Sequence, residues 1–256
     1  RFVVFLLASM AFDAAWSAVN RDEQEEARAI AIANDLERTF ADMPMVAPRK
    51  PQIFRILEEF GNSNPDIGYT QGMNYVAATL VLKFHPREDT ARKKFNEVLL
   101  QFSGFWSDGF PLLGVGVQLY QRLAERHLPS LSSHLDRCGV EPLSYLPNGW
   151  LSLFGKWLPL PAVIEVMDLF VEFGLRGVLA VTLALFHMQQ RRFIAARAME
   201  HVLELINQDM RTSPIDGELL VKSAKLWLPS VNRAVAESYG IPETNQLVDF
   251  GTRGNT

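Results

Sequence analysis

Two polar side chains, Arg38 and Gln71, stand at the ends of predicted helices, where a ligand could reach them. Arginine presents a fixed fork of N–H donors and stays protonated, so it can make two parallel hydrogen bonds to an oxyanion. Glutamine can accept a hydrogen bond from a water molecule and donate one to an anion, while it remains uncharged. The pair could therefore bind an anionic group together with a neighbouring water molecule.

Gln71 lies in a predicted turn directly before a helix. Pro65, Gly68 and Gly72 mark the turn, because proline and glycine are the commonest residues at such positions. After the turn, apolar residues recur at the spacing of a buried helical face, namely Met73, Val76, Leu80 and Phe84. Because glycine has no Cβ, another backbone segment or a ligand can approach Gln71 closely.

Arg38 follows the end of a second predicted helix, which begins near Asp22 and runs to about Glu37. Asp22 is a plausible N-cap, and glutamates in the first turn favour the helix dipole. Asp35 and Arg38 lie three residues apart, so the carboxylate can hold the guanidinium before any partner arrives. The apolar row of this helix faces the other way and consists of Ile32, Leu36 and Phe40.

The segments Ile32-x-x-Asp35-x-x-Arg38-Thr39 and Tyr69-x-Gln71-Gly72-Met73-Asn74 resemble the two signature motifs of the TBC family, the GTPase-activating proteins for Rab GTPases. A fainter likeness continues through residues 150–174 and covers roughly residues 30–228 in all. Two departures lie outside the motif residues. Met167 stands where the family usually has tryptophan, and Phe40 is followed by alanine where proline is common.

The resemblance implies a role for each motif residue. Arg38 and Gln71 would be the arginine and glutamine fingers that enter the nucleotide site of the GTPase. Asp35 would orient Arg38, and Tyr69 would pack beneath the groove. The remaining supporting or partner-binding residues would be Thr39, Gly72 and Asn74.

The function implied by the resemblance is acceleration of GTP hydrolysis by a Rab-family small GTPase in its GTP-bound form, in vesicle trafficking. GTP and Mg²⁺ would belong to the partner, so the resemblance implies no cofactor of the chain's own, no metal ligands and no independent active site. The alternative is a catalytically inert TBC-like helical scaffold that binds a GTPase or another protein.

The apolar spacing is helical along the whole chain and shows no period-two strand runs, which predicts an all-α fold. The resemblance implies a multi-helix TBC-type domain of two closely packed lobes, with a groove that carries the fingers. We expect an apolar helix packing on the domain in residues 1–21, the TBC domain in residues 22–228, and a C-terminal helix and flexible tail in residues 229–256. Residues 2–12 also resemble a signal peptide, but Asp13 interrupts the apolar run and favours a buried first helix.

Composition excludes several classes of protein. The net charge of −4 and the pI of about 5.8 argue against a nucleic-acid surface. A single cysteine excludes an internal disulfide. We find no zinc-site spacing, no phosphate-binding loop and no apolar run of the roughly 18 residues that a membrane span needs. We therefore expect a cytoplasmic chain, recruited peripherally to endomembranes through its GTPase partner or through regions outside this sequence.

Overall fold

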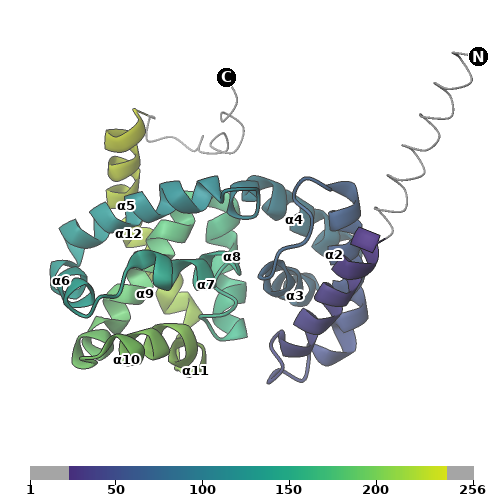
Figure 1. Ribbon diagram of the computed structural model, residues 1–256, viewed down its shortest axis with the longest axis horizontal. Helices are drawn as coiled ribbons and strands as arrows, with labels where there is room; N and C mark the ends of the chain where they lie inside the picture. Colours follow the sequence, from purple (N-terminus) through teal and green to yellow (C-terminus); the bar gives the residue numbers. More distant parts are fainter. Residues whose placement is uncertain (1–22, 241–256) are drawn as a thin grey trace, which may run out of the picture.

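The computed structural model describes residues 23–240, and every regular element in this part of the chain is helical (Figure 1). The predicted all-α class is therefore confirmed. The predicted helix in residues 1–21 and the tail from residue 241 lie outside the described residues. The elements are residues 23–38, η1 (Ala47–Arg49), α2 (Lys50–Ser63), α3 (Met73–Phe84), α4 (Glu88–Gln101), η2 (Ser103–Phe105), α5 (Pro111–His127), α6 (Pro129–Arg137), η3 (Pro142–Ser144), α7 (Leu146–Trp150), α8 (Leu160–Phe173), α9 (Leu175–Ala195), α10 (Met199–Glu204), η4 (Leu205–Asp209), α11 (Met210–Thr212) and α12 (Gly217–Tyr239).

The helices form two groups that lie side by side (Figure 1). One group contains residues 23–38 with α2, α3 and α4, and the other contains α5 to α12. Helix α3 of the first group contacts α8 of the second, and α5 starts beside the end of α4 through η2. The arrangement agrees with the two packed lobes that the sequence predicted.

Helix α3 is the central helix of the first group. Residues 73–81 are all buried, and the helix packs against α2, α4 and α8. Of the predicted apolar stripe, Met73, Val76 and Leu80 are buried and Phe84 is partly buried. Because other helices surround α3, the start of this helix is held in place, and with it the preceding turn that carries Gln71.

Helix α12 corrects the predicted C-terminal boundary. We expected a separate helix to begin at Pro229, but α12 runs through this residue without interruption. The predicted boundary between residues 228 and 229 therefore falls inside one helix. An internal proline costs about 3 kcal/mol, and burial of apolar side chains on both sides of it against α8 and α9 offsets this cost, the residues being Leu220, Ala224, Val231 and Val235.

Three other boundaries differ from those that the local sequence pattern predicts, namely a helix end at Gly61, a helix over residues 151–158 and a new helix after Arg191. Helix α2 does not stop at Gly61 but continues to Ser63, because the missing Cβ makes room for the Arg28 side chain, whose Cδ would lie 2.7 Å from it. Residues 151–158 form consecutive turns instead of a helix. Helix α9 continues past Arg191 as far as Ala195, since the buried Phe193 keeps its last turn packed against the core.

Within residues 23–240, no helix has both the length and the apolar character needed to cross a membrane.

Candidate functional site

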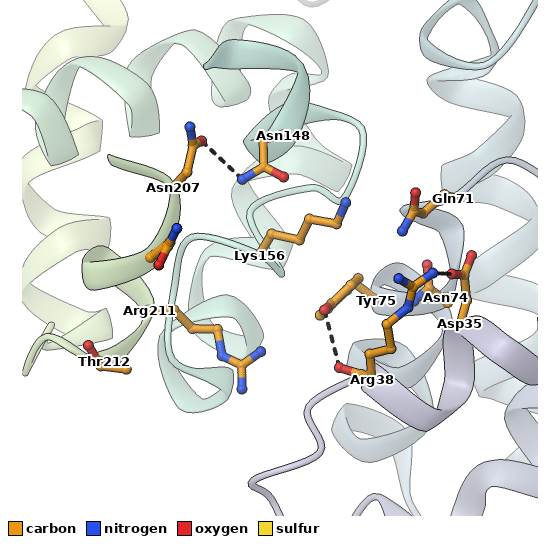
Figure 2. A pocket seen from close by; sticks show the side chains of 11 residues that line it. Asp35, Arg38, Gln71, Asn74, Tyr75, Asn148, Lys156, Asn207, Arg211 and Thr212 are labelled. Carbon is orange, nitrogen blue, oxygen red and sulfur yellow. Dashed lines mark hydrogen bonds and ion pairs between the residues drawn. The ribbon is translucent and has the colours of Figure 1, made fainter. Parts of the chain in front are cut away.

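Arg38 and Gln71 line the same pocket, which has a volume of about 430 Å³ (Figure 2). Arg38 is the last residue of the helix over residues 23–38, and Gln71 lies in the turn before α3. Both side chains are exposed, and Figure 2 shows both extending into the pocket. The full lining is Asp35, Arg38, Gln71, Asn74, Tyr75, Asn148, Lys156, Asn207, Gln208, Arg211 and Thr212.

A chain of charged and polar side chains holds Arg38 in place. Its Nη2 donates to Asp35 Oδ1 at 2.7 Å, as the sequence predicted, and the Tyr69 hydroxyl donates to Asp35 Oδ2 at 2.7 Å. The side chain of Asp35 is only 8% exposed whereas that of Arg38 is 67% exposed. The carboxylate is thus fixed on both oxygens, and the guanidinium remains available to a ligand.

A second chain of hydrogen bonds joins the two motif segments. Thr39 Oγ1 donates to the Asp35 carbonyl at 2.7 Å, and Asn74 Nδ2 donates to Thr39 Oγ1 at 2.7 Å. Asn74 Oδ1 in turn accepts from the Gly72 N–H at 2.8 Å. Thr39 and Asn74 are both buried, where hydrogen bonds are expensive to break. These contacts fix the Gln71 turn relative to the end of the Arg38 helix.

Gly72 permits the close backbone approach that the sequence predicted. Its φ of +119° lies in a region that other residues rarely adopt. A Cβ built on Gly72 would lie 2.2 Å from the carbonyl oxygen of Leu151. The same oxygen accepts a hydrogen bond from Trp106 Nε1 at 3.1 Å. The second lobe, through Leu151, therefore contacts the turn that carries Gln71.

Tyr69 and Tyr75 both donate hydrogen bonds to the helix turn that carries Arg38. Burial, followed by the hydrogen bond to Asp35, raises the pKa of Tyr69 well above its usual range. Burial also raises the pKa of Tyr75, whose hydroxyl donates to the Arg38 carbonyl at 3.4 Å. The Tyr75 ring packs edge-on against Phe40, with 5.0 Å between the ring centroids. Both hydroxyls stay protonated at neutral pH and act as donors.

The opposite wall of the pocket comes from residues that the sequence analysis missed. Asn148 Nδ2 donates to Asn207 Oδ1 at 3.0 Å. Arg211 forms an ion pair with Asp42, and its guanidinium carbon lies 5.9 Å from the centroid of the Phe40 ring. Other members of this wall are Lys156, Gln208 and Thr212. One signal could have been noticed in the sequence, since Lys156 is the only charged residue between residues 142 and 164.

No group of three or more histidine, cysteine, aspartate or glutamate residues in the described chain could hold a metal ion. Among residues 23–240, Asp35 supplies the only carboxylate of the pocket, and this is already engaged by Arg38 and Tyr69. Its donor groups are guanidinium, ammonium, amide and hydroxyl, which suit an anion rather than a cation.

Comparison with solved structures agrees with this fold. The chain is similar to the Chlamydomonas flagellar RabGAP TBC domain, with a TM-score of 0.67 and 18% sequence identity over 79% of this chain and 70% of the other. It is also similar to the Ypt/Rab-GAP domain of Gyp1p, with a TM-score of 0.66 and 18% identity over 80% of this chain and 74% of the other. At this level of identity the likeness concerns the fold.

Comparison with curated proteins gives relatives with longer chains. Mouse Carabin is 30% identical over 61% of this chain and 36% of its own. Human small G protein signaling modulator 3 is 28% identical over 92% of this chain and 33% of its own, and the GTPase-activating protein GYP5 of Saccharomyces cerevisiae is 25% identical over 70% and 20%. The chain thus spans about a third or less of the length of these relatives.

A family model, the Rab-GTPase-TBC domain, matches residues 14–194. The matched range is well over half of the 256 residues and includes both motif segments, the turns after α7 and most of α9. The chain therefore belongs to the Rab-GTPase-TBC domain family.

Proposed function

We propose that this chain is a GTPase-activating protein that accelerates GTP hydrolysis by a Rab-family GTPase in its GTP-bound form. The observation that carries the proposal is the meeting of Arg38 and Gln71 at one pocket, from segments far apart in the sequence. Membership of the Rab-GTPase-TBC domain family supports the kind of partner. Peripheral recruitment to endomembranes by that partner is part of the proposal.

The chemistry follows from the two side-chain types. During phosphoryl transfer to water, negative charge spreads over the phosphate oxygens while a water molecule must be held in line. Arg38 supplies charged donors to those oxygens, and Asp35 keeps its guanidinium directed at them. Gln71 positions the attacking water through its amide. GTP and Mg²⁺ arrive with the partner, so the chain contributes side chains only.

The size of the effect can be estimated from arginine fingers in general. A finger supplied in trans accelerates hydrolysis by about 10³- to 10⁵-fold. Because the Arg38 side chain is largely exposed and Asp35 keeps its hydrogen bond from Tyr69 when Arg38 is removed, Arg38→Ala should remain folded. Loss of activity without loss of fold is therefore the expected signature.

A single-turnover assay of GTP hydrolysis over a panel of Rab GTPases tests the proposal. Wild type is compared with Arg38→Ala and Gln71→Ala. Matched controls are Arg137→Ala on α6 and Gln118→Ala on α5, which are exposed and do not line the pocket. We expect wild type and both controls to stimulate at least one GTPase, and both finger variants to lose most of the stimulation.

Two results would contradict the proposal in different ways. If wild type binds a GTPase but accelerates hydrolysis by none of the panel, the chain is a catalytically inert scaffold and not an activator. If stimulation is present and survives both finger substitutions, the activity is real but the site lies elsewhere.

A further inference from the structure

Lys156 is a third cationic side chain that reaches the pocket, from the wall opposite the fingers. It lies in the turns between α7 and α8, and Figure 2 shows its side chain extending across the pocket toward Gln71. Its sequence neighbours are apolar and buried, including Phe154 and Trp157. Lys156 itself is only partly buried. Lys156 is thus the one charged side chain that this segment contributes to the pocket.

Lys156 differs from the other two cations of the pocket in having no counterion. Arg38 is paired with Asp35, and Arg211 is paired with Asp42. Among residues 23–240, no group accepts a hydrogen bond from the Lys156 ammonium or forms an ion pair with it. The lining holds three cationic side chains and one anionic side chain, although the whole chain has a net charge of −4. The pocket is therefore a positive site on an acidic protein, which favours an anionic ligand.

The backbone around Lys156 is held firmly. Its N–H donates to Ser152 Oγ at 3.2 Å, and that hydroxyl shares its one proton between the carbonyls of Asn148 and Gly149, each 3.0 Å away. Leu153 and Phe154 have φ values of +40° and +69°, which cost energy and persist only where the surrounding structure imposes them. The lysine is thus placed by a constrained segment.

This segment is also packed against the finger side of the pocket. A Cβ built on Gly155 would lie 2.5 Å from Tyr75 Cβ, and one built on Gly72 would lie 2.2 Å from Leu151 O. Two close approaches therefore fix the Lys156 segment relative to Gln71 and to Tyr75. The ammonium and the fingers belong to one preorganised arrangement, which reduces the cost of binding.

We propose that Lys156 is a further anion-binding residue of the same site and contacts the transferring phosphoryl group from the side opposite Arg38. The inference rests on the proposed function, since it takes the phosphate of the GTPase-bound nucleotide as the anion. An anion between the Lys156 ammonium and the Arg38 guanidinium is attracted by both and relieves the repulsion between them. No bond of Lys156 is made or broken, because it only donates hydrogen bonds to phosphate oxygens.

The electrostatic state of Lys156 agrees with this role. Burial lowers its pKa, Asp35 raises it by charge attraction, and Arg38 lowers it by repulsion. The charges of Asp35 and Arg38 therefore already act on Lys156 across the pocket. A phosphate bound between Lys156 and Arg38 would raise the lysine pKa and favour its charged form.

The experiment uses Lys156→Met, which keeps most of the side-chain length without the charge, and Lys156→Arg, which keeps the charge. Lys225→Met is the matched control, because Lys225 is exposed on α12 and away from the pocket. Each variant is measured for single-turnover stimulation of a GTPase that wild type stimulates. Its affinity is also measured for that GTPase loaded with GDP alone and with GDP plus aluminium fluoride, which mimics the transferring phosphoryl group.

We expect Lys156→Met to lower both stimulation and affinity for the aluminium fluoride complex by about 10- to 100-fold, as for loss of a hydrogen bond between charged groups. Affinity for the GDP complex should stay within about twofold of wild type, and Lys156→Arg should recover a large part of both losses. Thermal unfolding of Lys156→Met should match that of the control, which separates binding from folding.

Three outcomes would overturn the inference. Full stimulation and affinity in Lys156→Met would show that the lysine is not used. If Lys156→Met weakens affinity for the GDP complex and for the aluminium fluoride complex equally, Lys156 binds an acidic side chain of the GTPase and not the phosphate. A loss explained by lower thermal stability would make the residue structural. By contrast, absence of stimulation by wild type on every GTPase would contradict the proposed function itself.

Discussion

Asn74 donates a buried hydrogen bond of 2.7 Å to Thr39, across 35 residues of sequence. This bond joins Thr39, next to Arg38, to Asn74, three residues after Gln71, and no hydrogen bond in the described chain joins Arg38 to Gln71 directly. Arg38 and Gln71 are therefore positioned by their neighbours and remain free to meet a ligand.

Thr39→Val should destabilise the protein and weaken stimulation together. The substitution keeps the shape but leaves the buried Asn74 amide without its acceptor, at a cost of about 1–3 kcal/mol in the free energy of unfolding. Urea denaturation measures the loss. In a double-mutant cycle with Asn74→Ala the two effects should be clearly less than additive. The control is Thr90→Val on α4, where the threonine is partly exposed. Additive effects of Thr39→Val and Asn74→Ala, or an equal loss of stability in Thr39→Val and Thr90→Val, would contradict the coupling.

Gly72→Ala should strongly lower the stability of the protein, although it adds only one carbon atom. Its Cβ would meet the Leu151 carbonyl oxygen at 2.2 Å, and its φ of +119° is unfavourable for alanine. Overpacking and backbone strain together should cost on the order of 3 kcal/mol or more. Chemical denaturation provides the measurement. Gly68→Ala is the control in the same turn, since its nearest contact is 3.9 Å away and its φ is +61°, so only the left-handed strain of about 1 kcal/mol should appear.

Arg38→Lys should stimulate hydrolysis almost as poorly as Arg38→Ala. Lysine keeps the charge and can still pair with Asp35, but it lacks the planar fork that binds two phosphate oxygens at once. Single-turnover hydrolysis provides the comparison, with an expected loss of at least about 100-fold. Near-normal turnover by the lysine variant would show that charge alone is sufficient.

Stability should fall when the pH rises above about 10, the ordinary pKa of tyrosine. The pKa values of Tyr69, Tyr75, Tyr120 and Tyr145 are all raised, mainly by burial. Above that pH the unfolded chain loses these protons while the folded chain keeps them, so the unfolded state is favoured. The pKa of Lys156 is lowered, so this residue makes stability rise with pH just below its ordinary pKa of 10.5. Lys156 is a single group, whereas the four tyrosines act in the other direction.

Urea unfolding at pH 8 and at pH 10.5 measures this dependence. Tyr69→Phe removes one of the four contributions, so its stability should decline less steeply between the two values than that of wild type. An unchanged or steeper decline in the variant would contradict the assignment of Tyr69.

The parts of the site that the sequence could predict are those set by local patterns. Asp35 and Arg38 share a helix face through their spacing, and glycine at position 72 indicates a close approach. Which oxygen fills that space could not be predicted, because Leu151 comes from the other lobe. The wall with Lys156 was missed for the same reason, since its residues come near Arg38 and Gln71 only after both lobes pack.

The misplaced boundaries have a related cause. Pro229 and Gly61 are local signals for a helix end, and in both places tertiary packing outweighs the signal. In residues 151–158 the apolar composition suggests a helix, but the left-handed φ values of Leu153 and Phe154 turn the chain so that their side chains are fully buried. Such a conformation depends on contacts that a single stretch of sequence does not reveal.

Residues beyond position 194 line part of the pocket and cover part of the core, which matters for the design of shorter fragments. A fragment cut at the end of the family match would retain Arg38 and Gln71 but lose Asn207 and Arg211 from the pocket. It would also lose α12 and uncover apolar surfaces of α8 and α9, which invites aggregation. Inactivity of such a fragment would say nothing about Arg38 or Gln71, and expression should extend at least through Tyr239.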